Sequence, residues 1–248
     1  MSGTCLIVGS GRAGGSFHAA LSVIGWTCEL GSSRSATLPN LADVDLVLLT
    51  VPDAAIAEVA AAMPPTDAVI AHVSGACDLD VLAPHDRVGS IHPLMSLPDP
   101  ETGSRRLLDH CTFAVDGDPL MTELATALGG VAIEVPGPKR ALYHATAAIA
   151  ANHLTALCAQ VESLATVVGV PVAAYWTLMS TTLDNIADVG PAAALTGPAA
   201  RGDWDTIRTH LAALPTDDDR HLYLALCEHA AHLAGRALDT DLDPGEFV

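Results

Sequence analysis

The sequence predicts an α/β domain with a mostly parallel sheet, followed by an all-α domain. Two observations support this prediction. In residues 1–136, short β-rich runs alternate with helix-like runs, which is typical of a parallel sheet covered on both faces. In residues 137–248 that alternation stops and only helical patterns continue. Two prolines and a glycine at 136–138 end the last strand, so we place the domain boundary between residues 136 and 137.

The predicted elements of the first domain follow one another with short connections. Apolar runs predict the strands, and longer amphipathic runs predict the helices between them. The strands are expected at 5–8, 26–30, 45–51, 68–73, 87–91, 112–115 and 131–135, and the helices at 13–24, 53–63 and 119–128.

The second domain is predicted to hold four main helices. They are expected at 140–168, 173–187, 203–214 and 216–238. A Gly-Val-Pro break at 169–171 separates the first from the second. Thr216 precedes three aspartates, a pattern that caps a helix and complements its dipole.

Composition narrows the class of protein. Half of the residues are apolar, which is enough to fill a core. The formal net charge of −18, with Lys139 as the single lysine, argues against binding to nucleic acid or to anionic membranes. There is no apolar run of about 20 residues and no basic leader at the start, so we expect a cytoplasmic protein. The six cysteines lack metal-site spacing, so we expect free thiols and no metal.

A glycine motif opens the chain's first helix. The residues are Gly9, Ser10, Gly11, Arg12, Ala13 and Gly14, directly after a predicted strand. In this context the first glycine permits a tight turn, the second lets the backbone approach a pyrophosphate, and the third allows close packing of helix on strand. The motif therefore predicts a dinucleotide-binding Rossmann domain. The alternative is a glycine-rich turn that binds nothing.

The end of the second strand points to the type of dinucleotide. Domains that bind NAD carry an aspartate or glutamate at this position. This chain has Ser32 and Ser33 there, followed by Arg34. Hydroxyls and a guanidinium suit a 2′-phosphate, so we predict NADP(H). The rival is Glu29, which lies early for this role. Further along, Val51 and Pro52 end a strand at the edge where the cofactor is expected, and we predict that their backbone lies against the nicotinamide. Asp53 follows them and is better suited to cap the next helix than to act as a catalyst.

With these residues in place, the chain resembles a known family. The strings that carry the resemblance are GSGRAGG at 9–15, HVSGA at 72–76, GSIHPL at 89–94, LYHATAAIAAN at 142–152 and LTGPAARGD at 195–203. They resemble the bacterial Rossmann-like proteins with a C-terminal helical domain of unknown function. These are related to 6-phosphogluconate dehydrogenases, pyrroline-5-carboxylate reductases and ketopantoate reductases. The resemblance implies a helical domain like that of 6-phosphogluconate dehydrogenases and a homodimer formed through it.

The resemblance also implies where substrate binds, between nicotinamide and the first long helix of the second domain. His144 and Asn152 lie on one face of that helix, roughly 12 Å apart along its axis. We expect His144 to act as acid and base and Asn152 to orient the substrate. The alternative is an ordinary helix histidine and a buried amide. Tyr143, on the same helix, is a candidate for substrate binding.

Other residues remain open as partners in the chemistry. His92 follows a strand of the first domain and could bind a carboxylate or donate the proton in place of His144. Ser74 could contact nicotinamide or substrate, and Arg201 could bind a substrate carboxylate or pair with Asp203. Relatives use a lysine four residues before an asparagine on this helix. Here Lys139 has Tyr143 at that distance, so it is a second choice as donor.

These inferences lead to one main hypothesis and two alternatives. The first is an NADP(H)-dependent oxidoreductase that moves a hydride to or from a small carboxylate-bearing 2-oxo acid or imine, of ketopantoate or pyrroline-carboxylate type. The second is hydride exchange between NADP and a deazaflavin, which needs no dedicated proton donor. The third is a non-catalytic NADP(H)-binding sensor or scaffold.

Overall fold

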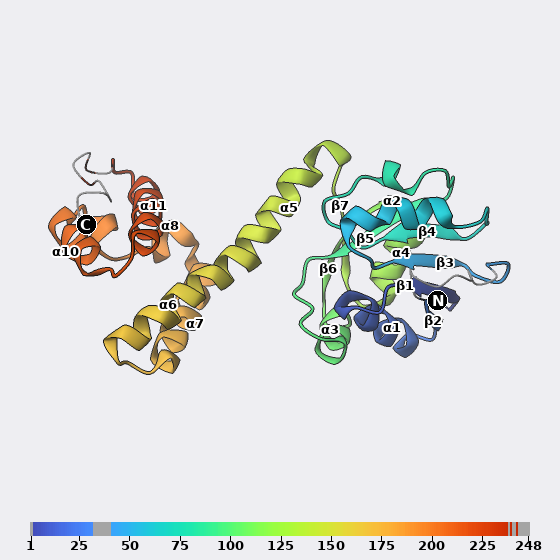
Figure 1. Ribbon diagram of the computed structural model, residues 1–248, viewed down its shortest axis with the longest axis horizontal. Coiled ribbons are helices and arrows are strands. Elements are labelled where there is room, and N and C mark those ends of the chain that lie inside the picture. The colour runs from blue at the N-terminus through green and yellow to red at the C-terminus, as the bar shows by residue number, and fades with distance from the viewer. Residues whose placement is uncertain (1, 32–40, 238, 240–241, 243–248) are drawn as a thin grey trace. The chain divides into compact units, whose positions relative to one another are not determined.

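The computed structural model describes residues 2–31, 41–237, 239 and 242, and it forms two compact units (Figure 1). The first unit is Met1–Leu154 and the second is Thr155–Val248. The first unit holds the sheet and also the first helix after it. Arg140 and Tyr143 of that helix hydrogen-bond to groups of the sheet and its loops. The domain boundary predicted at 136/137 coincides with the end of the sheet and remains a prediction.

The first unit is built on one sheet of seven strands, in the order β2-β1-β3-β4-β5-β6-β7. Every pairing is parallel except that of β6 with β5, which is antiparallel. The expectation of a mostly parallel α/β domain is therefore confirmed. The strands are β1 (Thr4–Val8), β2 (Thr27–Gly31), β3 (Leu46–Leu49), β4 (Val69–His72), β5 (Val88–Pro93), β6 (Thr112–Gly117) and β7 (Val131–Glu134).

Alternating side chains of the central strands fill two separate cores, one on each face of the sheet. Ile7 and Leu48 pack on one face and Leu6 and Leu49 on the other, as the period of two in a strand requires. The first core is covered by α1 (Arg12–Val23), α3 (Pro100–Leu107) and α4 (Leu120–Ala127). The second is covered by α2 (Asp53–Ala62) and the short helix η1 (Leu79–Leu82). All four central side chains are at most 2% exposed, so the parallel strands are fully buried.

Helix α3 was not predicted, because its sequence PETGSRRL lacks an apolar period. Its start is set locally instead: the Asp99 carboxylate accepts a hydrogen bond of 2.8 Å from the backbone N–H of Thr102. Gly103 then faces Ser16 of α1 so closely that a Cβ would lie 2.0 Å from the serine hydroxyl. Close packing on α1 therefore compensates for the missing apolar face.

The long helix predicted at 140–168 is present, but it is interrupted. It consists of α5 (Arg140–Ala148), the π-helical segment η3 (Ile149–His153) and α6 (Leu154–Val168). A π-turn widens the helix and is frequent at functional sites. Asn152 lies within this segment.

The second unit contains the remaining helices. They are α7 (Val172–Val189), α8 (Pro191–Ala194), α9 (Pro198–Arg201), α10 (Trp204–Ala213) and α11 (Asp217–Leu233). Thr216 caps α11, as predicted, and Asp203 caps α10. The helix predicted to reach 238 ends at Leu233, because Gly235 takes a positive φ of 71°.

The described residues hold no helix that is long and apolar enough to cross a membrane. Within the same residues no cluster of histidine, cysteine and acidic side chains is arranged to hold a metal ion. All six cysteines are free, and three of them, Cys5, Cys111 and Cys227, are buried.

A first prediction concerns the core that supports the site. Leu48→Ala removes a fully buried side chain from β3, so we expect the free energy of unfolding to fall by about 2–5 kcal/mol. Leu142→Ala is the matched control, because Leu142 is 71% exposed and its loss should cost less than about 1 kcal/mol. Urea unfolding followed by circular dichroism measures both. Equal losses would mean that the core is not where the structure places it.

Candidate functional site

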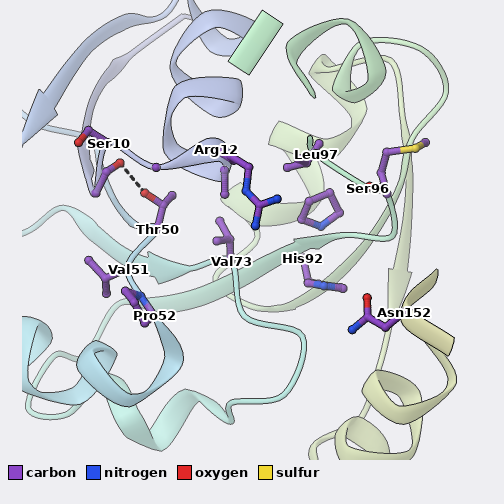
Figure 2. Close-up of a pocket in the computed structure, with 15 residues that line it drawn as sticks. Ser10, Arg12, Thr50, Val51, Pro52, Val73, His92, Ser96, Leu97 and Asn152 are labelled. Carbon is purple, nitrogen blue, oxygen red and sulfur yellow. Dashed lines mark hydrogen bonds between the residues drawn. The ribbon is translucent and has the colours of Figure 1, made fainter. Parts of the chain in front are cut away.

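The turn between β1 and α1 is held by two close backbone approaches. Gly9 has a φ of 118°, and a Cβ on Gly14 would lie 1.8 Å from the Gly9 carbonyl oxygen. The Thr50 hydroxyl donates to the carbonyl oxygen of Val8 at 3.1 Å. It also donates to the carbonyl oxygen of Gly9 at 2.8 Å (Figure 2). No role was predicted for Thr50, yet its side chain joins the end of β3 to this turn. Both glycines are therefore required by packing, with or without a ligand.

The N-terminus of α1 is open to an anion. Gly11 caps the helix without a side-chain hydrogen bond, and no acidic residue lies in the first turn. The first-turn N–H groups lack helical partners and carry a partial positive charge. A Cβ on Gly11 would meet nothing within 4 Å, so there is space beside the backbone. This is the combination that a pyrophosphate needs, so the residues present fit a dinucleotide.

One cavity of about 780 Å³ joins this turn to residues at the ends of other strands. The side chains of Arg12, His92 and Asn152 face it from three different elements (Figure 2). Its predicted members are Gly9, Ser10, Gly11, Arg12, Ala13, Val51, Pro52, His92 and Asn152. The structure therefore brings the predicted phosphate turn, the predicted floor and two predicted catalytic residues together.

A histidine–tyrosine cluster lies beside this cavity. His92 Nδ1 and the Tyr143 hydroxyl are joined by a hydrogen bond of 2.8 Å. The rings of His92 and His144 meet edge to face, with centroids 6.1 Å apart. Gly75 makes room for both rings, because a Cβ there would lie 2.9 Å from each. These three side chains and Asn152 line a second cavity of about 490 Å³.

The environment of the cluster disfavours a proton on His92. Burial, then the neighbouring His144 and Arg140, lowers the pKa of His92 to about 4. Burial also raises the pKa of the Tyr143 hydroxyl. At pH 7 His92 is therefore a neutral imidazole and Tyr143 a neutral phenol. Both can exchange hydrogen bonds with a polar group placed between them and His144.

Ser74 holds the loop after β4. Its hydroxyl oxygen accepts hydrogen bonds of 3.1 Å from the N–H groups of Ala76 and Cys77, and its own N–H donates to His72 Nδ1. The residue is 6% exposed. Its contacts are thus those of a loop-closing serine, and its predicted contact with nicotinamide or substrate stays a prediction.

Other predicted residues lie elsewhere. Lys139 precedes α5, and it is not among the described residues that line either cavity. Arg201 ends α9 in the second unit, whose placement relative to the first is not defined. Ser32, Ser33 and Arg34 lie outside the described residues. The capping role expected of Asp53 is wrong: Pro52 occupies the cap position of α2, and no side chain bonds there.

The two glycines of the turn give a second prediction. Gly14→Ala forces a methyl group onto the Gly9 carbonyl, so we expect it to lower the free energy of unfolding by at least about 2 kcal/mol. Gly11→Ala has open space and an ordinary φ of −72°, so its cost should stay within about 1 kcal/mol. Thermal and urea unfolding compare the two. A tolerant Gly14→Ala variant would contradict the packing described for the turn.

Comparisons with known proteins agree with this architecture. The family description "Rossmann-like domain" matches residues 30–98, and "Domain of unknown function (DUF2520)" matches residues 111–230. A comparison with curated proteins gives no match.

Solved structures share the fold at low sequence identity. Protein BF3122 from Bacteroides fragilis, named as a candidate NADP oxidoreductase, has a TM-score of 0.80 at 18% identity, over 93% of this chain and 98% of that one. Protein TM1727 from Thermotoga maritima has a TM-score of 0.72 at 24% identity, over 93% and 98%. The 1-pyrroline-5-carboxylate reductase from Streptococcus pyogenes has a TM-score of 0.62 at 14% identity, over 93% and 99%. This chain is therefore similar to Rossmann-like domains over residues 30–98 and to the DUF2520 domain over residues 111–230, a range that includes β6 and β7.

Proposed function

We propose that this chain is an NADP(H)-dependent oxidoreductase that transfers a hydride to or from a small carboxylate-bearing 2-oxo acid or imine. One observation carries the proposal: the glycine turn and His92 line the same cavity, with the Tyr143–His144 pair adjoining it. A dinucleotide site alone would suit many activities. A dinucleotide site that meets a cluster of hydrogen-bonding side chains suits hydride transfer coupled to proton transfer.

The cofactor is assigned to the turn and its surroundings. The backbone amides in the first turn of α1 and the side chain of Arg12 are suited to bind the phosphates. Val51 and Pro52 line the same cavity and are proposed to lie against the nicotinamide. When bound, the cofactor supplies or accepts the hydride. The preference for NADP(H) rests on Ser32, Ser33 and Arg34 of the sequence. Glu29, the rival, pairs with Leu6 in the sheet, two positions before the end of β2 at Gly31, which disfavours it.

The chain's own side chains handle the proton. His144 is the proposed donor to the oxygen or nitrogen of the reduced group, and it takes the proton back in the reverse direction. His92 and Tyr143, both neutral at pH 7, hydrogen-bond that group and orient it. A positive charge on His144 would disfavour a second positive charge on His92. Asn152 faces the cavity from the π-segment and supplies an orienting amide.

The substrate class rests on likeness and on composition. A 1-pyrroline-5-carboxylate reductase and an NADP oxidoreductase candidate share the fold. Arg201 is proposed to bind the substrate carboxylate from the second unit, in a homodimer formed through the helical domain. In support of a dimer, α7 has no buried residue, and its exposed side chains include Leu178, Leu183 and Val189. The cytoplasmic location remains a prediction.

The cofactor preference is tested by titration. We expect NADPH to bind at least about tenfold more tightly than NADH, a difference near 1.4 kcal/mol, as followed by nicotinamide fluorescence. Arg34→Gln should abolish that preference by removing the 2′-phosphate ligand. Arg87→Gln is the control, because Arg87 bonds to Asp118 and the Asp67 carbonyl and should change neither affinity. Equal binding of both dinucleotides by the wild type would refute the NADP(H) preference and favour Glu29.

The proton donor is tested by turnover. With a panel of 2-oxo acids and cyclic imines, loss of NADPH absorbance identifies a substrate. His144→Asn should then lower kcat by about 10²–10⁴-fold and leave the Kd for NADPH within about twofold. His153→Asn is the matched control, since His153 is exposed on the same helix and lines neither cavity.

The other two hypotheses give different results. Turnover with a deazaflavin that tolerates His144→Asn would replace the proposed function by exchange between two cofactors. Tight NADPH binding without turnover of any member of the panel would favour a sensor or scaffold. Failure to bind either dinucleotide would exclude all three.

A further inference from the structure

Arg140 is a buried charged residue for which the proposed function has no use. It is the first residue of α5, and its side chain is 2% exposed. Arginine is rarely buried to this extent unless it is fully paired. Its position is also notable, because Tyr143 and His144 follow it by about one helical turn on the same helix.

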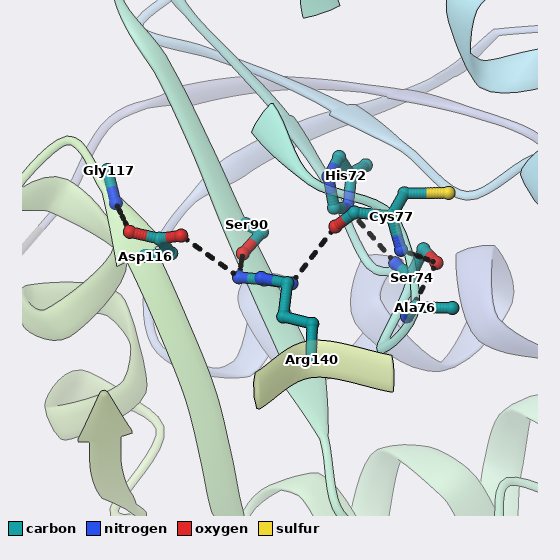
Figure 3. Close-up of polar contacts among 8 residues, drawn as sticks. All are labelled: His72, Ser74, Ala76, Cys77, Ser90, Asp116, Gly117 and Arg140. Atoms are coloured by element: carbon teal, nitrogen blue, oxygen red, sulfur yellow. Dashed lines mark hydrogen bonds and ion pairs between the residues drawn. The ribbon is translucent and has the colours of Figure 1, made fainter. Parts of the chain in front are cut away.

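The guanidinium of Arg140 reaches three separate elements (Figure 3). Nη1 donates to the carbonyl oxygen of Cys77, at 3.2 Å, in the loop after β4. Nη2 donates to the Ser90 hydroxyl on β5, a strand that also carries His92, and to the Asp116 carboxylate on β6 at 3.4 Å. One side chain thus fastens the start of α5 to the strand and the loop that border the histidine cluster.

The positive charge of Arg140 is only partly compensated. Its single carboxylate partner, Asp116, has a side chain that is 38% exposed, and the Arg140 Nε has no partner among the described residues. Keeping an incompletely paired charge away from water costs free energy, and an apolar side chain could fill the space without that cost. Packing alone therefore does not account for an arginine here.

We infer that Arg140 is a positioning residue of the candidate site, which fastens Tyr143 and His144 over the strand that carries His92. The inference deepens the proposed function, on which its consequence for turnover rests. The charge acts in addition to the hydrogen bonds: after burial, Arg140 contributes to lowering the pKa of both His72 and His92 to about 4. Arg140 thereby helps to keep His92 neutral.

The other charged and titratable groups around His92 act in both directions. His144 and Tyr143 face it from α5, and His72 lies on β4. Asp53 at the start of α2 favours a proton on His92, whereas His144 and His72 disfavour it together with Arg140. Removing the charge of Arg140 should therefore raise the pKa of His92.

The experiment compares two variants that differ in charge. Arg140→Gln keeps a hydrogen-bond donor and removes the charge, whereas Arg140→Lys keeps the charge and loses the planar guanidinium with its several N–H donors. The readout is the pH titration of the histidine ring signals by NMR, with the His92 signal assigned from its loss in His92→Gln. We expect the pKa of His92 to be about 4 in the wild type and to rise toward 6.5 in Arg140→Gln. In Arg140→Lys it should lie closer to the wild-type value than to that of Arg140→Gln. Arg87→Gln, which removes an arginine paired with Asp118, should leave the titration unchanged.

A second readout uses the wild type and variants with a substrate. Arg140→Gln should lower kcat at least about tenfold, because the donor and its partners are no longer held together, and leave the Kd for NADPH within about twofold. Equal titration of His92 in the Gln and Lys variants would overturn the role of the charge. A wild-type His92 that titrates near 6.5 would overturn it too, even if neither variant folds. The NMR titration does not depend on turnover. If the pKa of His92 changes as expected in the variants but the protein reduces no substrate, the proposed function is rejected and the role of Arg140 stands.

Discussion

The approach of Gly14 to the carbonyl oxygen of Gly9 constrains the whole first unit. With no Cβ on Gly14, α1 can start directly behind β1 and lie against the sheet, where Phe17 and Leu21 enter the first core. The same geometry turns the N-terminus of α1 toward the carboxyl ends of the parallel strands. A side chain on either glycine would displace the helix, the Thr50 contact and the space beside Gly11 together.

The candidate site residues lie along the edge of the sheet where the parallel strands end. Thr50 follows β3, Gly75 follows β4 and His92 lies near the end of β5, so three neighbouring strands contribute to one border. Their order in the sheet places the glycine turn and His92 around one cavity, and Tyr143 and His144 line the second cavity with His92. The cluster is neutral at His92 because burial and neighbouring positive charge act in the same direction. In the proposed function, hydride transfer and proton transfer both take place at this edge of the sheet.

Much of this arrangement follows from the sequence. The glycine motif predicted the turn, the apolar runs predicted all seven strands, and His92, His144, Tyr143 and Asn152 were expected near one another. These features were accessible because a local pattern determines each of them: a turn needs glycine, a buried strand needs an apolar run, and the carboxyl ends of parallel strands share an edge.

What the sequence did not reveal depends on long-range contacts. No role was predicted for Arg140, because a local sequence pattern does not show that contacts with β5 and the loop after β4 bury it. The antiparallel β6 and the π-turn around Asn152 likewise have no local signature. Helix α3 was missed because it packs through Gly103 and lacks an apolar stripe. The residues predicted to bind the 2′-phosphate, Ser32, Ser33 and Arg34, lie outside the described residues.

The most direct test of this account is a crystal structure of the protein with NADP⁺. We predict that the pyrophosphate binds the backbone amides at the start of α1, between Gly9 and Ala13, and that the nicotinamide lies beside Pro52 and faces His92. That result would place the reactive carbon within reach of the histidine cluster. A dinucleotide bound elsewhere, or a nicotinamide turned away from His92, would contradict the central claim that the glycine turn and the histidines form one active site.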